Sequence, residues 1–298
     1  MSSSAARRGD WTILKLIEWS GQYLNKKGID RGRLDAEHLL AHAMSTTRLD
    51  LYLQYDRLLS GPELDQYRPL LTRRARREPL QYIVGRAGFR NLELEVDQGV
   101  LIPRPETEIL VDEVLQWVSD NKLKNPGALD IGTGSGAIAL SLVHEGPFSR
   151  VVATDTSSVA LEVATRNSLM SGLSDRVDFR LGEFYEPLTV GEVFEVIVSN
   201  PPYVADGEAQ DLDPEIREWE PGAALYAGPD GLAALRRIAT GAGPYLKPGG
   251  LLALEVGLGQ ATYIMELLEN TGEFRTVRVC RDLSGRERVV LAHGEMTD

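Results

Sequence analysis

A buried strand, a turn of alternating glycines and an apolar helix follow one another in this chain of 298 residues, and this succession limits its fold most strongly. The strand ends at Asp130, and the helix begins at Ala137. Glycines let a backbone approach a ligand closely, and the start of a helix offers unpaired N–H groups. We therefore expect an α/β sheet that binds its ligand at this turn, through Gly132, Thr133, Gly134, Ser135 and Gly136.

The glycines are spaced as G-x-G-x-G, which differs from the dinucleotide fingerprint and from a phosphate-binding loop. No lysine or arginine occurs between Asp130 and His144, so the turn carries no cation that would pair with a phosphate. The pattern therefore disfavours a phosphate-bearing ligand.

Two later strands end in residues that suit a nucleoside. Arg150–Asp155 ends in a carboxylate, which in nucleoside-binding α/β folds accepts hydrogen bonds from ribose hydroxyls. The alternative for Asp155 is a solvated cap of the next helix. The strand Val177–Leu181 is followed by Glu183 and Phe184, an acid for the adenine amino group and a ring for its face. These two residues could also follow a strand without any ligand.

Asn200-Pro201-Pro202-Tyr203 follows a fourth apolar run, Phe194–Ser199. Consecutive prolines donate no backbone hydrogen bonds and stiffen the chain, so the carbonyls before them become fixed acceptors. Two acceptors beside the flat ring of Tyr203 suit a planar NH2 group that is held by both hydrogens. For an isolated motif, the alternative is a proline-rich turn without chemistry.

The charge balance disfavours a DNA enzyme. The chain has 32 basic and 44 acidic residues and a formal net charge of −12, whereas duplex binding depends on neutralising phosphates with Lys and Arg. One basic cluster, Arg73–Arg77, is interpreted as the solvated last turn of a helix, where cations suit the dipole. A surface for an acidic partner or ribosomal RNA is the alternative.

Other global features exclude several classes of protein. The single cysteine, Cys280, excludes an internal disulfide and a cysteine-based metal cluster, and no metal site is expected. No apolar stretch reaches the length of about 18 residues that spans a membrane, and residues 1–8 lack the apolar core of a secretory signal. We expect a soluble, cytoplasmic protein.

The N-terminal part of the chain is predicted to be helical. Residues 1–9 are expected to be flexible, and residues 10–80 to form a small bundle that recognises the substrate. Its first helix would be capped by Asp10. The other helices are expected at Leu34–Met44, Leu49–Gln54 and Pro62–Arg77.

Residues 81–103 are expected to link this bundle to the sheet. Alternating Leu92, Leu94 and Val96, then a Gln98-Gly99 break, indicate a β-hairpin there. Pro103–Glu108 opens a helix that should run to about Trp117, with a proline and acids in its first turn. Residues 104–298 would form the catalytic domain.

Together, the glycine turn, the acidic strand end and the motif resemble a class I S-adenosylmethionine-dependent methyltransferase. Asn-Pro-Pro-Tyr resembles the motif of those members that methylate a planar amino nitrogen of adenine, cytosine or glutamine. The segments 77–85 and 101–108, with Glu220-Pro221, Ala224-Leu225 and Asp230-Gly231-Leu232, are similar to the bacterial peptide chain release factor N5-glutamine methyltransferases, also called the HemK family. The resemblance covers residues 10–293. It implies a Rossmann-like sheet with helices on both faces, preceded by a helical bundle and a linking hairpin.

The resemblance also implies the reaction. S-adenosylmethionine would lie at the glycine turn and at Asp155, with Glu183 and Phe184 near its adenine. The family often carries Asp and Trp at these last two positions. The substrate is the glutamine of a Gly-Gly-Gln tripeptide in class I release factors, whose amide would lie between Asn200, Pro201, Pro202 and Tyr203. Its N–H groups would go to the Asn200 side-chain oxygen and the Pro201 carbonyl.

Several readings stay open beside this one. A ribosomal-protein glutamine methyltransferase, an adenine-N6 nucleic-acid methyltransferase and a non-catalytic adaptor are the alternatives. A monomer that binds neither duplex DNA nor a membrane is expected. The acidic segment Val204–Glu220 could be a lid or a disordered loop.

Overall fold

The computed structural model describes residues 11–282 and 284–294, and the chain folds into two compact units. The first unit combines residues up to Gly85 with the distant segment Pro214–Trp219. The second holds Arg86–Asp213 and the chain from Glu220 onward. No helix within these described ranges is both long enough and apolar enough to cross a bilayer.

The first unit is a set of short helices around its own core. Fully buried side chains such as Leu24, Leu39 and Tyr67 fill that core. The helices are α1 Ile13–Asn25, α2 Gly32–Ala43, α3 Arg48–Leu53, α4 Gly61–Arg74, α5 Leu80–Val84 and α9 Pro214–Trp219. Capping boxes at Thr47 and Ser60 begin α3 and α4. The predicted helical character of this region is confirmed.

The cap of α1 differs from the prediction. Its N-cap is Thr12, whose hydroxyl accepts from the Lys15 N–H at 3.3 Å. Asp10 lies outside the described residues, and the helix begins at Ile13, too far along the chain for Asp10 to be its N-cap. The prediction of an Asp10 cap was therefore wrong.

The basic cluster at the end of α4 is solvated only in part, because Arg76 is exposed whereas Arg74 is buried. Arg74 is buried, and its Nε donates to Asp35 Oδ2 at 2.7 Å. Arg73 pairs with Glu78, and Arg77 Nε donates to Glu215 Oε2 on α9 at 2.9 Å. These guanidinium groups are thus bound to carboxylates inside the first unit, which also weakens the alternative of a surface for RNA.

The second unit is a mixed seven-stranded sheet in the order β5-β4-β3-β6-β7-β9-β8. The five strands from β5 to β7 are parallel neighbours, and β9 and β8 add antiparallel pairs. The strands are β3 Gly127–Ile131, β4 Arg150–Asp155, β5 Val177–Leu181, β6 Phe194–Ser199, β7 Leu246–Glu255, β8 Phe274–Arg281 and β9 Glu287–Gly294. This confirms the predicted fold class.

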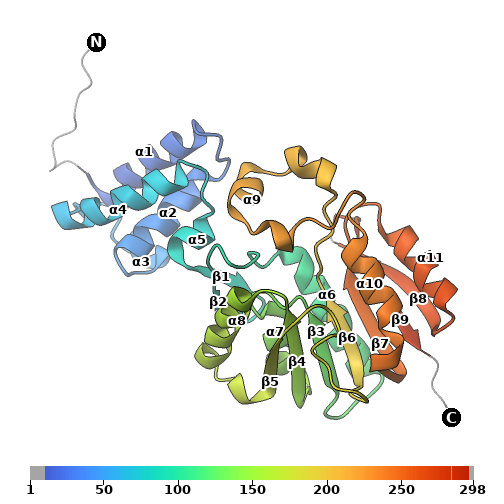
Figure 1. The fold of residues 1–298 in the computed structure, drawn as a ribbon. Coiled ribbons are helices and arrows are strands. Elements are labelled where there is room, and N and C mark those ends of the chain that lie inside the picture. The colour runs from blue at the N-terminus through green and yellow to red at the C-terminus, as the bar shows by residue number, and fades with distance from the viewer. Residues whose placement is uncertain (1–10, 283, 295–298) are drawn as a thin grey trace. The chain divides into compact units, whose positions relative to one another are not determined.

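Helices cover both faces of this sheet (Figure 1). Alternate strand residues face opposite sides, so Ala128 belongs to one core and Leu129 to the other. The helices are α6 Pro105–Asp120, α7 Ala137–Glu145, α8 Ser158–Met170, α10 Ala233–Gly241 and α11 Ala261–Thr271, with short 3-10 turns at Ser174–Arg176, Asp206–Asp211, Gly222–Ala224 and Gly243–Tyr245. One core receives α6 and α7, and the other receives α10 and α11.

The chain reverses its direction across the sheet between β3 and β6. From β3 it proceeds outward through β4 and β5, and it then returns to pair β6 with the other edge of β3. The carboxyl ends of β3 and β6 therefore flank a topological switch point, where open α/β sheets bind ligands.

The predicted hairpin is present, but its turn lies elsewhere. Strands β1 Arg86–Phe89 and β2 Leu92–Glu95 pair antiparallel around Arg90-Asn91, not around Gln98-Gly99. Arg90 takes a left-handed φ of 52°, and its side chain binds Glu145. These bonds offset the cost of that backbone conformation, and composition alone does not reveal them.

Candidate functional site

The glycine turn and the Asn-Pro-Pro-Tyr motif lie side by side at the switch point. Ile131 of β3 is in register with Ser199 of β6, so Gly132 and Asn200 leave adjacent strands at the same level. The Ser199 hydroxyl donates to the Ile131 carbonyl at 2.7 Å and joins the two strand ends. The sequence elements that were predicted to form one site are therefore neighbours.

The glycine turn is left-handed at each of its glycines. Gly132, Gly134 and Gly136 have φ values of 73°, 55° and 84°. A Cβ at Gly132 or Gly134 would meet no atom within 4 Å, so both face open space that a ligand can enter. At Gly136 a Cβ would lie 3.3 Å from the Ala164 Cβ, so this glycine serves the packing of α7 on α8.

Asp155 at the end of β4 is bonded to the glycine turn. Its Oδ2 accepts from the Gly134 N–H at 2.9 Å, and its Oδ1 accepts from the Ser157 N–H at 2.9 Å. A carboxylate has about four lone-pair sites, so both oxygens keep capacity for ribose hydroxyls. Burial raises the pKa of this carboxyl, and its backbone N–H partners oppose that shift.

Asp130 is buried beneath the turn and stabilises its conformation through hydrogen bonds. Its Oδ2 accepts from the Thr133 hydroxyl at 2.7 Å and from the Ala139 N–H at 3.1 Å. Burial raises the pKa of Asp130 to about 7. This carboxyl joins the end of β3 to the first turn of α7.

A small cavity lies between the turn and the motif. Its volume is about 50 Å³. Of the predicted site residues, Gly132, Thr133, Gly134, Ser135 and Asn200 line it. The other lining residues are Phe89, Leu101, Pro103, Arg104, Thr107, Ala137 and Ile138.

A buried chain of hydrogen bonds supports the motif from behind. Asn200 Nδ2 donates to Thr107 Oγ1 at 2.9 Å, and that hydroxyl donates to Glu255 Oε2 at 2.7 Å. The Tyr203 hydroxyl donates to Glu255 Oε1 at 3.3 Å. Burial raises the pKa of Glu255 to about 7, and burial also raises the pKa of Tyr203. Tyr203 therefore remains a neutral O–H donor across the physiological range.

The backbone after the motif is also held. Gln260 Nε2 donates to the Tyr203 carbonyl at 2.9 Å. Val204 and Leu225 share a backbone hydrogen bond of 2.9 Å, as do Ala227 and Val204. These contacts explain why Ala224-Leu225 belongs to the same sequence signature as the motif.

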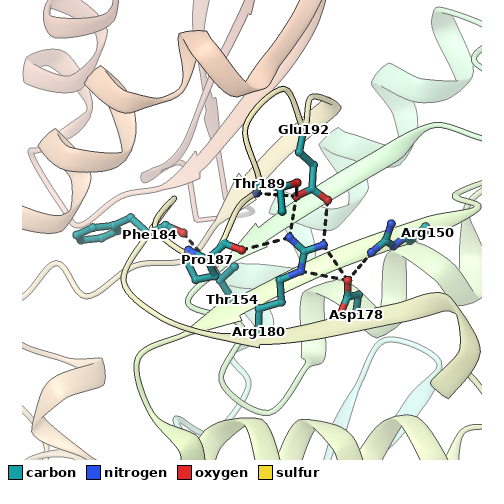
Figure 2. A network of polar contacts seen from close by, with 8 residues as sticks. All are labelled: Arg150, Thr154, Asp178, Arg180, Phe184, Pro187, Thr189 and Glu192. Carbon is teal, nitrogen blue, oxygen red and sulfur yellow. Dashed lines mark hydrogen bonds and ion pairs between the residues drawn. The ribbon is translucent and has the colours of Figure 1, made fainter.

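The candidate adenine residues follow β5 on a loop that a charged network fixes (Figure 2). Arg180 donates to both oxygens of Glu192, at 2.7 and 2.9 Å, and to the Pro187 carbonyl at 3.3 Å. The Thr154 hydroxyl donates to the Phe184 carbonyl at 3.3 Å. The Arg237 guanidinium lies 5.3 Å from the centroid of the Phe184 ring. Glu183 is exposed and Phe184 is half-buried, and neither is among the residues that line the cavity.

The segment after the motif is not structureless. It contains the 3-10 turn Asp206–Asp211 and helix α9, whose Glu215 accepts from Arg74 at 3.0 Å within the first unit. At its end, Arg104 Nη2 donates to the buried Glu220 Oε1 at 2.6 Å. Glu220 thereby attaches the segment to the start of α6.

Thr107 and Glu255 are the site residues that were missed. Thr107 lies within the Pro103–Glu108 run that carried the resemblance, and Glu255 lies within the apolar strand Leu251–Val256. An acid in a buried apolar run was the available signal, because an ionisable side chain is rarely buried without a partner.

Comparison with known proteins agrees with this geometry. The family described as PrmC N-terminal domain matches residues 15–85, and the methyltransferase small domain matches residues 107–215. A crystal structure of a methyltransferase from Pyrococcus furiosus superposes with a TM-score of 0.52 at 20% identity, covering 69% of this chain and 90% of that chain. The second unit therefore has a methyltransferase fold.

Two curated relatives extend the match to nearly the full length. The release factor glutamine methyltransferase of Geobacter sulfurreducens is 42% identical, over 94% of this chain and 96% of its own length. That of Rhodopirellula baltica is 37% identical, over 94% and 95%. This chain belongs to the release factor glutamine methyltransferase family.

Proposed function

We propose that this protein transfers a methyl group from S-adenosylmethionine to the side-chain amide nitrogen of the glutamine in the Gly-Gly-Gln motif of class I release factors, in support of translation termination. The observation that carries the proposal is the position of Asn200, whose side chain is hydrogen-bonded to Thr107 at the switch point, next to the glycine turn. Membership of the family favours a release factor over a ribosomal protein or a nucleic acid as the substrate.

The residues around the cavity fit the proposed cofactor. Gly132 and Gly134 face open space, and the turn carries no cation, which suits a ligand without phosphate. Asp155 and the open side of the turn would hold the ribose and the methionine moiety. Glu183 and Phe184 stay candidates for the adenine. When bound, the cofactor supplies an electrophilic methyl group.

The motif would activate an amide nitrogen, which is a poor nucleophile because its lone pair is delocalised. The carbonyl of Pro201 and the Asn200 side-chain oxygen would each accept one N–H of the substrate. Pro202 stiffens this segment, and the Tyr203 ring limits the plane of the amide. Holding both N–H groups raises electron density on nitrogen and fixes its approach, which removes much of the entropic barrier. No general base is assigned, since the proton can leave after methyl transfer.

The first unit would recognise the release factor. It has its own core and carries large apolar side chains on its surface, with Leu53 at 72% and Leu58 at 59% exposure. Exposed apolar clusters commonly mark protein interaction sites. We further propose that the enzyme acts as a monomer in the cytoplasm.

The proposal is tested by incubating the protein with methyl-labelled S-adenosylmethionine and three acceptors. These are a release factor, its variant with the Gly-Gly-Gln glutamine replaced by alanine, and duplex DNA. Label on the intact factor alone is expected, and label on DNA would overturn the proposal. Asn200→Ala should lower transfer by about two orders of magnitude while cofactor affinity changes little. A variant with near-normal turnover would remove the mechanism.

A further inference from the structure

One buried carboxylate contacts both ends of the motif through hydrogen bonds. Glu255, at the end of β7, is 1% exposed. Leu254 is in register with Ser199, so Glu255 lies level with the residue that follows β6. It accepts from Thr107, which in turn binds Asn200, and directly from Tyr203.

The direction of these bonds follows from the chemistry of the groups. An ionised carboxylate only accepts, so both hydroxyls must donate to it. The Thr107 hydroxyl has a single proton. Because it donates this proton in the hydrogen bond to Glu255, the hydroxyl can only accept from Asn200. The carboxamide must then turn its NH2 group toward Thr107 and its oxygen away. The two ends of an amide look alike in shape, and this chain of donors distinguishes them.

We propose that Glu255 is a positioning residue, which acts through Thr107 to aim the Asn200 oxygen at the acceptor nitrogen and holds Tyr203 directly. This inference rests on the proposed function for the identity of the acceptor. Its structural content, the orientation of the Asn200 amide, does not depend on that identity.

Protonation of Glu255 would remove the constraint on the orientation of the Asn200 amide. A protonated Glu255 can donate to Thr107, whose hydroxyl can then donate to the Asn200 oxygen and reverse the amide. The charged groups that act on Glu255 are Arg288 on β9, which favours the ionised form, and Glu106 on α6, which opposes it. The state in which the Asn200 oxygen faces the acceptor nitrogen is therefore favoured at higher pH. We expect kcat to rise with pH as Glu255 loses its proton.

Three variants separate positioning from packing. Thr107→Val keeps the shape and removes the hydroxyl, Thr107→Ser keeps the hydroxyl, and Glu255→Gln keeps one acceptor oxygen but does not titrate. Thr107→Val should lower kcat by about 10- to 100-fold with little change in either KM, and Thr107→Ser should restore most of it. Glu255→Gln should have a lower kcat that no longer rises with pH. Thr165→Val, which removes a hydroxyl that donates to the Leu161 carbonyl within α8, is the matched control and should keep wild-type turnover.

A second readout needs no methyl transfer. The chain has few asparagines, so selective 15N labelling gives few side-chain amide signals, and Asn200→Asp identifies the relevant pair. The Asn200 signals should move with pH in the wild type, with a midpoint near the Glu255 pKa of about 7, and stay fixed in Thr107→Val and Glu255→Gln.

The outcomes distinguish the two proposals. The positioning role would be overturned if the Asn200 signals of the wild type did not move with pH and were the same in both variants. A Thr107→Val enzyme with wild-type kcat would overturn it as well. If the signals respond as expected but the wild type labels no release factor, the positioning role stands and the proposed substrate is wrong.

Discussion

Gly231 lies so close to the carbonyl oxygen of Tyr203 that a Cβ on this glycine would be 2.4 Å from it. Its φ of 70° is also in the left-handed region. Asp230-Gly231-Leu232 thus belongs with the motif for a steric reason, because its glycine makes room for the backbone of Tyr203.

Gly231→Ala is expected to displace Tyr203 and to reduce turnover by about 100-fold, since displacement of a positioning group by about 1 Å has that effect. The matched control is Gly259→Ala, where φ is 81° and a Cβ would meet nothing within 4 Å. Both substitutions cost about 1–2 kcal/mol of backbone strain. Steady-state kinetics beside thermal unfolding separate the effects, and equal turnover in the two variants would contradict the steric explanation.

Arg180 should control cofactor affinity through the loop that follows β5. Arg180→Met removes bonds to Glu192 and Pro187, so we expect the Kd for S-adenosylmethionine to rise by about 10-fold, which corresponds to about 1.4 kcal/mol. Arg150→Met is the control, because Arg150 is exposed and pairs with Asp178 of β5, which Arg180 also binds, but not with the loop. Calorimetric titration measures both. An unchanged Kd in Arg180→Met would show that the loop does not bind the cofactor.

Asp130 should make the wild-type protein less stable as pH rises. Between its ordinary pKa of 3.8 and its raised value of about 7, the folded protein keeps a proton that the unfolded chain releases. The contribution of this group is therefore full below that window, and it falls as pH rises through it, by up to about 1.4 kcal/mol per pH unit. Asp130→Asn removes the effect, so the free energy of unfolding of the variant relative to wild type should increase between about pH 5 and pH 7.5. Denaturant titrations at both pH values test this, and a constant difference would refute it.

The exposed apolar residues of the first unit should matter only for an intact protein substrate. Replacing Leu53 and Leu58 by Ser is expected to raise KM for the release factor by about 10-fold or more, since apolar anchors can each contribute more than about 1 kcal/mol to an interface. KM for a short Gly-Gly-Gln peptide should stay the same. Equal effects on both substrates would place recognition elsewhere.

Much of the sheet could be predicted from the sequence. Arg150–Asp155, Val177–Leu181 and Phe194–Ser199 have the predicted bounds, because each is a short run rich in apolar and β-branched residues that ends at a turn. Strand ends at a switch point then bring the glycine turn and the motif together by topology alone.

The support of the site could not be predicted in this way. Thr107 and Glu255 are 148 residues apart, and nothing local to either residue indicates the other. The turn at Arg90 depends on a carboxylate 55 residues away. Such long-range polar pairs are determined by tertiary structure and not by local pattern.

Helix α9 has a consequence for the order in which the protein can be completed during synthesis. Arg77 and Glu215 are 138 residues apart, although both belong to the first unit. At about 5–20 residues per second, roughly 7 to 28 s separate the synthesis of these two residues. During that interval Arg74 and Arg77 lack their shared carboxylate. The N-terminal unit emerges from the ribosome first, yet it becomes complete only after the Asn-Pro-Pro-Tyr motif has been made.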